Sequence, residues 1–253
     1  MSPLYDSHCH LDAAEFDADR PAVLARARDA GVARQLVPAV DRASWDAIRT
    51  LCAAEPGLRP AYGLHPMFLD RHQPYHTAEL RDWLESERPA AVGECGLDFF
   101  VDGLDPDKQR LYFRRQLELA RDFDLPVVLH ARRAVEEVIA TLREVGGQRG
   151  VVHSWSGSEE QARQLFELGF CLGIGGPVTY DRAKRLRRTV ASMPLDCLLL
   201  ETDAPDQPDA DWRGQRNEPA RLRQVLAVVA QLRGQPAAAI AEATSANALR
   251  LFG

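Results

Sequence analysis

The 253-residue sequence has no long hydrophobic run, which excludes one class of protein at once. No stretch of about 18 consecutive apolar residues occurs, so we expect no membrane span. The first residues, MSPLYDSHCHLD, lack a basic segment followed by an apolar one, so we expect no secretory signal. These two absences predict a protein of the cytoplasm that does not use a membrane as its partner.

Cysteine is too scattered for a disulfide framework. The five cysteines are Cys9, Cys52, Cys95, Cys171 and Cys197. Their number is odd, and most of them lie inside apolar, strand-like segments. This usage is typical of buried thiols in a reducing compartment, which again favours the cytoplasm.

The sequence also lacks an excess of positive charge. A formal net charge of -6 argues against a protein that coats nucleic acid through a long basic surface. A small phosphate-binding cleft is still possible, because a few bound cations reverse the local sign. The segment RAKRLRR at 182–188 holds five cations in seven residues. On a helix these cations spread around the axis, so we interpret the segment as a solvated face.

Short apolar runs alternate with amphipathic segments eight times, and no Gly/Ser-rich linker interrupts them. The expected strands are 4–10, 33–40, 59–66, 90–98, 125–132, 150–157, 170–176 and 197–205. Near-continuous apolar strands separated by helices predict a parallel sheet covered by helices. Eight such units in this length fit one (β/α)8 TIM barrel over residues 1–253, whose last two helices close the barrel and pack across it. The alternative is an open, doubly wound sheet.

Polar residues decide between these folds, because they fall at the ends of the expected strands. The six are His10, His65, Glu94, His130, His153 and Asp203. In a barrel the carboxyl ends of the strands converge on one face, where the active sites of such enzymes lie. In an open sheet the same residues would be strung along an edge and could not meet. The pattern therefore favours a barrel with one site at its C-terminal face.

Two histidines close together in DSHCHL, His8 and His10, indicate what that site holds. Side chains alternate along a strand, so both rings point the same way while Cys9 points the other. The four strand-end histidines and two carboxylates are too many ligands for one tetrahedral ion and about the number for two, and Glu94 is the natural bridge between them. A lone buried histidine is more often hydrogen-bonded than metal-bound. Six ligand-type residues at strand ends make that reading improbable for the set.

Two other histidines, His72 and His76, lie in the segment DRHQPYHTAE and are interpreted as polar groups of a loop. They do not belong to the metal constellation.

The motifs DSHCHL, GLHP, VGECGLD, LHARRA, HSWSGS and ETDAP, in this order, resemble the TatD-related deoxyribonucleases of the amidohydrolase superfamily. ETDAPDQP and RNEPAR are similar to its YjjV-like branch in particular. The resemblance runs over essentially the whole chain. It implies a two-metal site, with His8, His10, Glu94 and Asp203 around one ion and Glu94, His130 and His153 around the other.

The chain departs from the family at one position of these motifs, where Trp155 stands in place of the usual Phe. This substitution concerns the substrate pocket and leaves the metal ligands complete. Related enzymes that hydrolyse phosphotriesters or lactones bridge their metals through a carboxylated lysine. The fourth expected strand has Glu94 and no lysine, which separates this chain from them.

The expected reaction is hydrolysis of a phosphodiester, with Asp203 and Glu94 as the catalytic carboxylates. Two divalent cations lower the pKa of a water and neutralise phosphate oxygens as charge builds. Asp203 can orient or deprotonate that water. Arg132, two residues beyond His130, is the candidate phosphate-binding cation. His65 is either a donor to the substrate or a histidine packed under the turn at Pro66.

Two further residues complete the expected site. Glu201, two residues before Asp203, should point inward one layer deeper and orient a metal-binding histidine, because an unpaired carboxylate there would be costly. Trp155 either stacks on a terminal base or packs against the barrel rim.

The ligand set admits several ions. Imidazole favours Zn²⁺, whereas carboxylates and phosphate chemistry admit Mg²⁺ and Mn²⁺. Our first hypothesis is a metal-dependent 3′-5′ exodeoxyribonuclease, a monomer acting on the ends of single-stranded DNA or RNA. The second is a small-molecule amidohydrolase, lactonase or phosphoesterase on the same barrel. The third, a non-catalytic metal-binding scaffold, fits a complete ligand set least well.

Overall fold

The computed structural model describes residues 3–253, whose strands all belong to one sheet. The strands are β1 (Leu4–Asp6), β2 (Val32–Pro38), β3 (Leu58–Tyr62), β4 (Ala91–Asp98), β5 (Val127–Arg132), β6 (Gly150–Val152), β7 (Phe170–Ile174) and β8 (Leu198–Leu200). Each is parallel to the next, in the order β1 to β8. The two edges are joined by the Ser7 N–H, which donates to the Leu200 carbonyl at 2.9 Å. The predicted (β/α)8 barrel is confirmed, and the open sheet is excluded.

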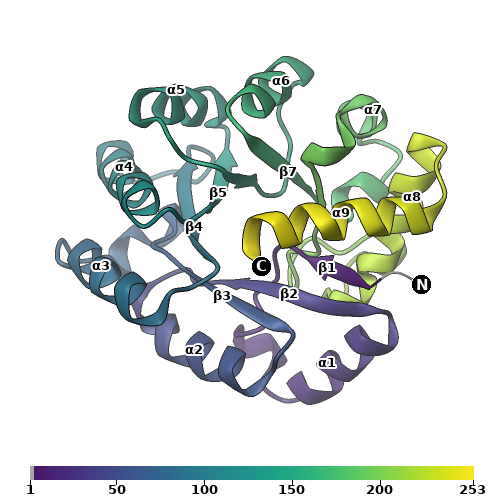
Figure 1. The fold of residues 1–253 in the computed structure, drawn as a ribbon, viewed down its shortest axis with the longest axis horizontal. Helices are drawn as coiled ribbons and strands as arrows, with labels where there is room; N and C mark the ends of the chain where they lie inside the picture. Colours follow the sequence, from purple (N-terminus) through teal and green to yellow (C-terminus); the bar gives the residue numbers. More distant parts are fainter. Residues whose placement is uncertain (1–2) are drawn as a thin grey trace.

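Helices surround the barrel on its outer side (Figure 1). The α-helices are α1 (Arg20–Asp29), α2 (Trp45–Ala54), α3 (His76–Glu87), α4 (Pro106–Asp122), α5 (Val135–Val145), α6 (Glu159–Glu167), α7 (Lys184–Ser192), α8 (Leu222–Arg233) and α9 (Ala237–Phe252). Short 3₁₀ turns are η1 (Ala14–Phe16), η2 (Arg42–Ser44), η3 (Pro66–Arg71), η4 (Gly176–Thr179), η5 (Leu195–Cys197), η6 (Ala210–Trp212) and η7 (Pro219–Arg221). None of the helices described for residues 3–253 combines the length and apolarity needed to cross a membrane.

Local signals in the sequence set several helix ends. The Asp105 carboxylate accepts N–H bonds from Asp107 and Lys108 at the start of α4. Ser158 and Gln161 form a reciprocal capping box at the start of α6. Gly234 ends α8 in the left-handed conformation, which a residue without Cβ adopts at no steric cost. The starts of α4 and α6 and the end of α8 are therefore fixed by local residues.

The barrel interior is filled near its N-terminal mouth by one apolar side chain from every strand. These are Tyr5, Leu36, Ala61, Ala91, Val128, Val151, Cys171 and Leu199, packed with Ala248 and Phe252 of α9. Helix α9 lies across this mouth (Figure 1), and Tyr5 and Phe252 contact each other with ring centroids 6.3 Å apart. The predicted packing of the last helix across the barrel is confirmed, and it covers the end opposite the strand termini that bear the polar residues.

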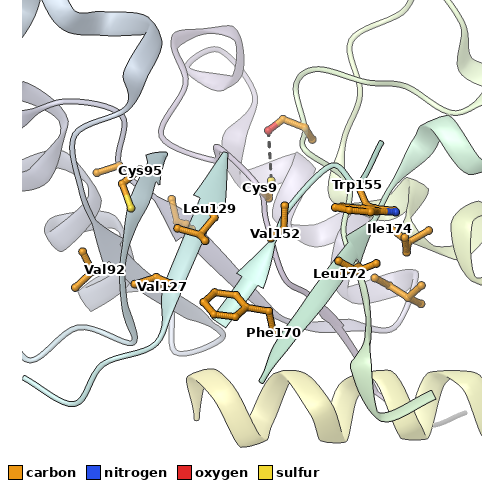
Figure 2. Packing of buried hydrophobic residues seen from close by; sticks show 14 of the residues in the cluster. Cys9, Val92, Cys95, Val127, Leu129, Val152, Trp155, Phe170, Leu172 and Ile174 are labelled. Carbon is orange, nitrogen blue, oxygen red and sulfur yellow. Dashed lines mark hydrogen bonds between the residues drawn. The ribbon is translucent and has the colours of Figure 1, made fainter. Parts of the chain in front are cut away.

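The alternate residues of the strands belong to a second and larger buried cluster, which includes residues of the helices. Figure 2 shows part of it, with Val127 and Leu129 of β5, Val152 of β6 and Leu172 of β7 packed together. Because neighbouring residues of a strand point to opposite faces, the residues of the inner layer are continued by inward positions two and four residues later. Val128 is followed by His130, Val151 by His153, and Leu199 by Glu201 and Asp203.

Candidate metal centre

All the predicted site residues gather at the C-terminal end of the barrel. Eight of them line one cavity of about 990 Å³: His10, His65, Glu94, His130, Arg132, His153, Trp155 and Asp203. His8 and Glu201 lie behind this lining with no exposed surface. The cavity is at the large end of the range for ligand pockets, about 300–1,000 Å³.

Strand β1 is shorter than predicted, because it ends at Asp6 rather than His10. The alternation nevertheless continues through the next residues. Cys9 points away from the cavity, where its thiol lies 3.7 Å from the Ala204 carbonyl, while His8 and His10 point together into the site.

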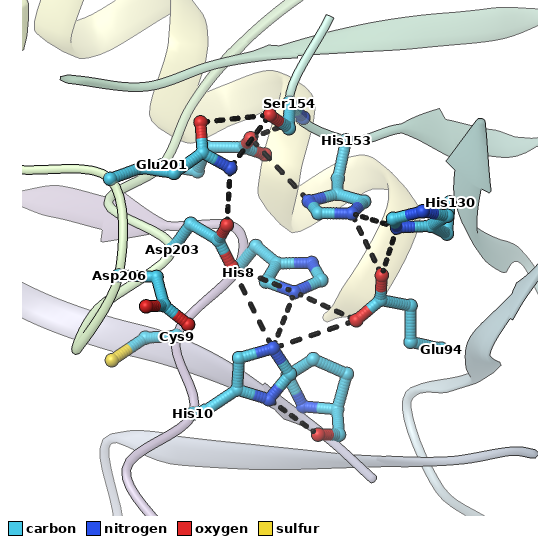
Figure 3. A network of polar contacts seen from close by, with 12 residues as sticks. His8, Cys9, His10, Glu94, His130, His153, Ser154, Glu201, Asp203 and Asp206 are labelled. Carbon is cyan, nitrogen blue, oxygen red and sulfur yellow. Dashed lines mark hydrogen bonds and ion pairs between the residues drawn. The ribbon is translucent and has the colours of Figure 1, made fainter. Parts of the chain in front are cut away.

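One group of donors is formed by His8, His10, Asp203 and one oxygen of Glu94 (Figure 3). The Nε2 atoms of His8 and His10 are 3.2 Å apart. They lie 3.2 and 3.5 Å from Glu94 Oε2. Their distances to Asp203 Oδ1 are 3.5 and 3.6 Å. Two imidazole nitrogens and two carboxylate oxygens therefore converge on one small volume.

The second group faces the other oxygen of the same carboxylate. Glu94 Oε1 lies 2.8 Å from His153 Nε2, 3.2 Å from His130 Nδ1 and 2.9 Å from His65 Nε2. His130 Nδ1 and His153 Nε2 are 3.4 Å apart. Glu94 thus stands between two histidine groups, as the bridging role would require.

A register shift in β4 places Glu94 where it lies. The pairing of β4 with β5 is irregular between Val92 and Cys95, so Glu94 does not continue the inner layer at an even spacing from Ala91. Its side chain is buried, and its N–H donates to the Ala39 carbonyl of the neighbouring segment. A strict two-residue alternation would have turned this carboxylate toward the helices.

Asp98, at the end of β4, was not predicted as a site residue. Its Oδ2 lies 2.8 Å from His130 Nε2, and its Oδ1 accepts the N–H groups of Phe100 and Val101. This contact holds the ring so that Nδ1 faces Glu94. The signal was present in the sequence, because a carboxylate ends the strand that carries Glu94 and pairs with the strand of His130.

Glu94 remains ionised because of the rings around it. Burial alone would raise its pKa, but His65, His153 and His8 hold the pKa well below its usual range. Burial would lower the pKa of His153, whereas the facing carboxylate of Glu94 raises it to about 10. Burial lowers the pKa of His8 to about 4, and the stacked ring of His153 acts in the same direction. The site therefore joins a fixed negative charge to rings of very different basicity.

Glu201 lies behind His153, one layer deeper than the cavity. Its Oε1 accepts the Ser154 N–H at 2.5 Å and is 3.8 Å from His153 Nδ1. Burial raises its pKa to about 8. Gly173 on β7 makes room for this carboxyl, because a Cβ there would come within 1.9 Å of Oε2.

Asp203 has a left-handed backbone, with φ of 56°. Its N–H donates to the His8 carbonyl at 2.9 Å, which fixes it beside the first group of histidines. The Gln207 amide donates to its Oδ2, and the same amide exchanges hydrogen bonds with the Ser154 hydroxyl. Oδ1 is consequently the oxygen directed at His8 and His10.

His65 matches the second of its two predicted roles, a histidine packed under the turn at Pro66. The Met67 N–H donates to its Nδ1 at 3.1 Å, so the ring proton is on Nε2, which donates to Glu94. Pro66 follows it at the start of η3. With its proton directed at Glu94, the ring has no donor to offer a substrate in this arrangement.

Arg132 and Trp155 differ in what they present to the cavity. Arg132 is exposed, and its guanidinium carbon lies 3.6 Å from the centre of the Phe100 ring. Trp155 is only 3% exposed and packs in the outer core, where a Cβ on Gly157 would come within 2.3 Å of its ring. Trp155 therefore packs at the rim and has little face to offer a base.

His72 lies in the loop after η3, as predicted, whereas His76 belongs to α3 and not to a loop. His72 is buried, with Nε2 2.8 Å from the His65 carbonyl, and His76 is the buried first residue of α3. Both lie outside the two donor groups because their side chains support the turn after His65 and the start of α3.

The relatives of this chain share its full length. The TatD related DNase family matches residues 5–253. The chain is 42% identical to the uncharacterized metal-dependent hydrolase YjjV of Escherichia coli K12, over 98% of this chain and 96% of YjjV. The crystal structure of that protein superposes with a TM-score of 0.95, at 40% identity, covering 98% and 97% of the two chains. A 3′-5′ ssDNA/RNA exonuclease TatD of Erwinia tasmaniensis is 35% identical, over 98% and 99%.

The barrel, its two donor groups and these relatives define a metal-dependent hydrolase. Among described residues, the donor triads capable of holding an ion are His8–Glu94–His153, His8–His10–Asp203 and His65–Glu94–His130. The extent of the family match and the identity to YjjV make the assignment more specific. The chain belongs to the TatD-related DNase family.

Proposed function

We propose that this protein is a phosphodiesterase that binds two divalent ions and removes nucleotides from the 3′ end of single-stranded DNA or RNA. Support for the substrate comes from the exonuclease name of the Erwinia relative, which is similar over its whole length. Support for the chemistry comes from the site itself.

The observation that carries the proposal is the position of Glu94 between two histidine groups. One of its oxygens faces His8 and His10, and the other faces His130 and His153. A carboxylate with an oxygen directed to each side is suited to hold two cations a few ångströms apart. The ring nitrogens within each group, 3.2 Å apart in His8 and His10 and 3.4 Å apart in His130 and His153, are also close enough to converge on one cation.

The donor set fits divalent ions of intermediate hardness. His8, His10, Asp203 and Glu94 would hold one ion, and Glu94, His130 and His153 the other. Imidazole with carboxylate suits Zn²⁺ and Mn²⁺ and admits Mg²⁺. Such a pair, when bound, makes a water more acidic and neutralises charge on the phosphate oxygens.

The residues of this chain then position the reactants. Asp203, fixed through the His8 carbonyl and Gln207, orients the attacking water and accepts its proton on the oxygen that faces the cavity. Arg132, steadied on Phe100, offers its guanidinium to a nonbridging phosphate oxygen. Glu201 supports His153 from behind through Ser154.

The test compares a linear single strand with a covalently closed circle of the same sequence, in Mn²⁺ or Mg²⁺. We expect the linear strand to lose nucleotides from its 3′ end and the circle to persist. Equal cutting of both would show an endonuclease. Cutting of neither, together with turnover of lactones or amides, would move the assignment to a small-molecule hydrolase.

We further propose that residues 1–253 act as one domain and as a monomer, since all the site residues come from this chain. Light scattering on the purified protein measures this directly. A dimer whose dissociation abolishes activity would contradict it.

A further inference from the structure

Four cations line the cavity, and none of them has a carboxylate partner. Arg182, Lys184 and Arg185 come from the β7–α7 loop and the first turn of α7, and Arg132 from the end of β5. Among residues 3–253, no ion pair involves any of the four, although most arginines of the chain are paired with an acid. We call the first three the α7 cationic cluster.

Four of the five cations of the basic segment 182–188 are exposed, as expected for a solvated segment, but only three of the five line the cavity. Arg187 turns away from the cavity, donating to the Val178 carbonyl and lying 3.4 Å from Asp181. Arg188 lies 3.7 Å from Glu159 of α6. The other three cations of the segment line the cavity. Contacts with neighbouring groups hold two of these side chains in place. Arg185 donates to the Ser156 carbonyl at 2.5 Å, and Arg182 lies 5.1 Å from the centre of the Tyr180 ring.

The part of the same cavity beyond β8 and β1 carries acids. Asp12 and Glu15 follow β1, and Asp206 follows β8. The cavity mouth is thus divided, with positive charge beyond β5 and β7 and negative charge beyond β8 and β1. Two catalytic ions would lie between these halves.

We propose that the α7 cationic cluster is a phosphate-binding subsite that holds the substrate strand on the 5′ side of the bond to be cut. This inference rests on the proposed nuclease function. Unpaired guanidinium and ammonium groups beside a phosphodiester site are suited to successive backbone phosphates, which carry one charge per nucleotide. The acids beyond β8 and β1 repel further phosphates on the 3′ side. A strand can therefore extend in one direction only from the reaction centre, which makes the enzyme act on an end.

The test uses a triple variant, R182Q/K184Q/R185Q, and a control, R81Q/R115Q/R163Q, which removes the same charge from exposed arginines of α3, α4 and α6. The substrates are single-stranded DNA oligomers of increasing length, at several salt concentrations. We expect kcat/KM of the wild type and the control to rise with length, and this gain to shrink about tenfold in the triple variant. The slope of log KM against log salt should fall by about 2, at about 0.7 per lost phosphate contact.

Each result decides between distinct conclusions. If the triple variant keeps the wild-type length gain and salt slope while digesting the oligomers, the subsite is wrong and the nuclease function stands. If the wild type digests no oligomer of any length, the proposed function is wrong, and so is the subsite proposal that rests on it. The single variant K184E serves as a second probe, and circular dichroism confirms that each variant is folded. A length gain in K184E equal to that of the wild type also contradicts the subsite.

Discussion

Single residues decide how this site holds charge, and Glu94 is the most informative. It is buried, ionised and directed at two histidine groups at once. Replacing Glu94 with Ala leaves two cations without a shared anion, so their repulsion is no longer offset. We expect elemental analysis of purified E94A to show the loss of at least one bound ion and of activity. E159A, on the outer helix α6, is the control. Two tightly bound ions in E94A with wild-type activity would contradict the bridge.

A substitution at Asp203 tests whether this residue accepts the proton of the attacking water. Asp203→Asn keeps the shape of the side chain and removes its charge. We expect turnover to fall by about a hundredfold or more, which is typical of losing a general base, while the thermal unfolding curve stays close to that of the wild type. Full activity of D203N in saturating Mn²⁺ would show that this carboxylate neither accepts the proton nor binds a needed ion.

The protonation of His153 predicts a pH dependence of ion binding. The Glu94 carboxylate raises the pKa of His153 to about 10, so the ion-free ring carries a proton at neutral pH. A cation needs the neutral ring and must displace this proton. Affinity for Mn²⁺ should therefore increase as the pH rises from about 6 to 8, by up to tenfold per pH unit for each displaced proton. Calorimetric titration in buffers of different ionisation enthalpy measures the release. Affinity that is flat over this range, with no proton release, would contradict it.

Among the elements of the fold, β7 contributes space rather than a ligand. Gly173 leaves room for the Glu201 carboxyl, and a Cβ there would collide with it. Gly173→Ala should push Glu201 away from Ser154 and His153, destabilising the protein by about 1–3 kcal/mol as overpacked sites do. Gly175→Ala, one residue beyond the end of β7 and with contacts of 3.4 Å or more, is the matched control. Denaturant unfolding measures both. Equal stabilities would mean that Glu201 adapts freely.

The elements also show how far sequence reasoning reaches. The parallel order of the strands and the convergence of His130, His153 and Asp203 follow from alternation and strand order alone. The inward direction of the Glu94 side chain does not follow from them, because it depends on an irregular pairing of β4 with β5. The pattern of residues does not indicate this irregularity. Asp98 was missed because the contact that reveals its role joins two neighbouring strands.

At the scale of the whole molecule, the distribution of charge matters more than its sum. The net charge of -6 describes the whole chain but not the cavity, where positive and negative side chains line different parts of the wall. The segment 182–188 illustrates why the sequence alone could not resolve this. The pattern places five cations on one helix and its approach, but only the packing of α7 against its neighbours selects the three that line the cavity.

The closure of the barrel by α9 affects how many nucleotides the enzyme removes before it releases the strand. The N-terminal mouth is filled by one side chain from each strand and covered by Ala248 and Phe252, so no polymer can thread through the protein. A released nucleotide must leave by the entrance that the next stretch of strand needs. We therefore expect distributive digestion, in which the enzyme lets go between cuts. With a labelled strand in excess and an unlabelled trap added after the start, products should stop shortening at once. Continued shortening past the trap would contradict this expectation.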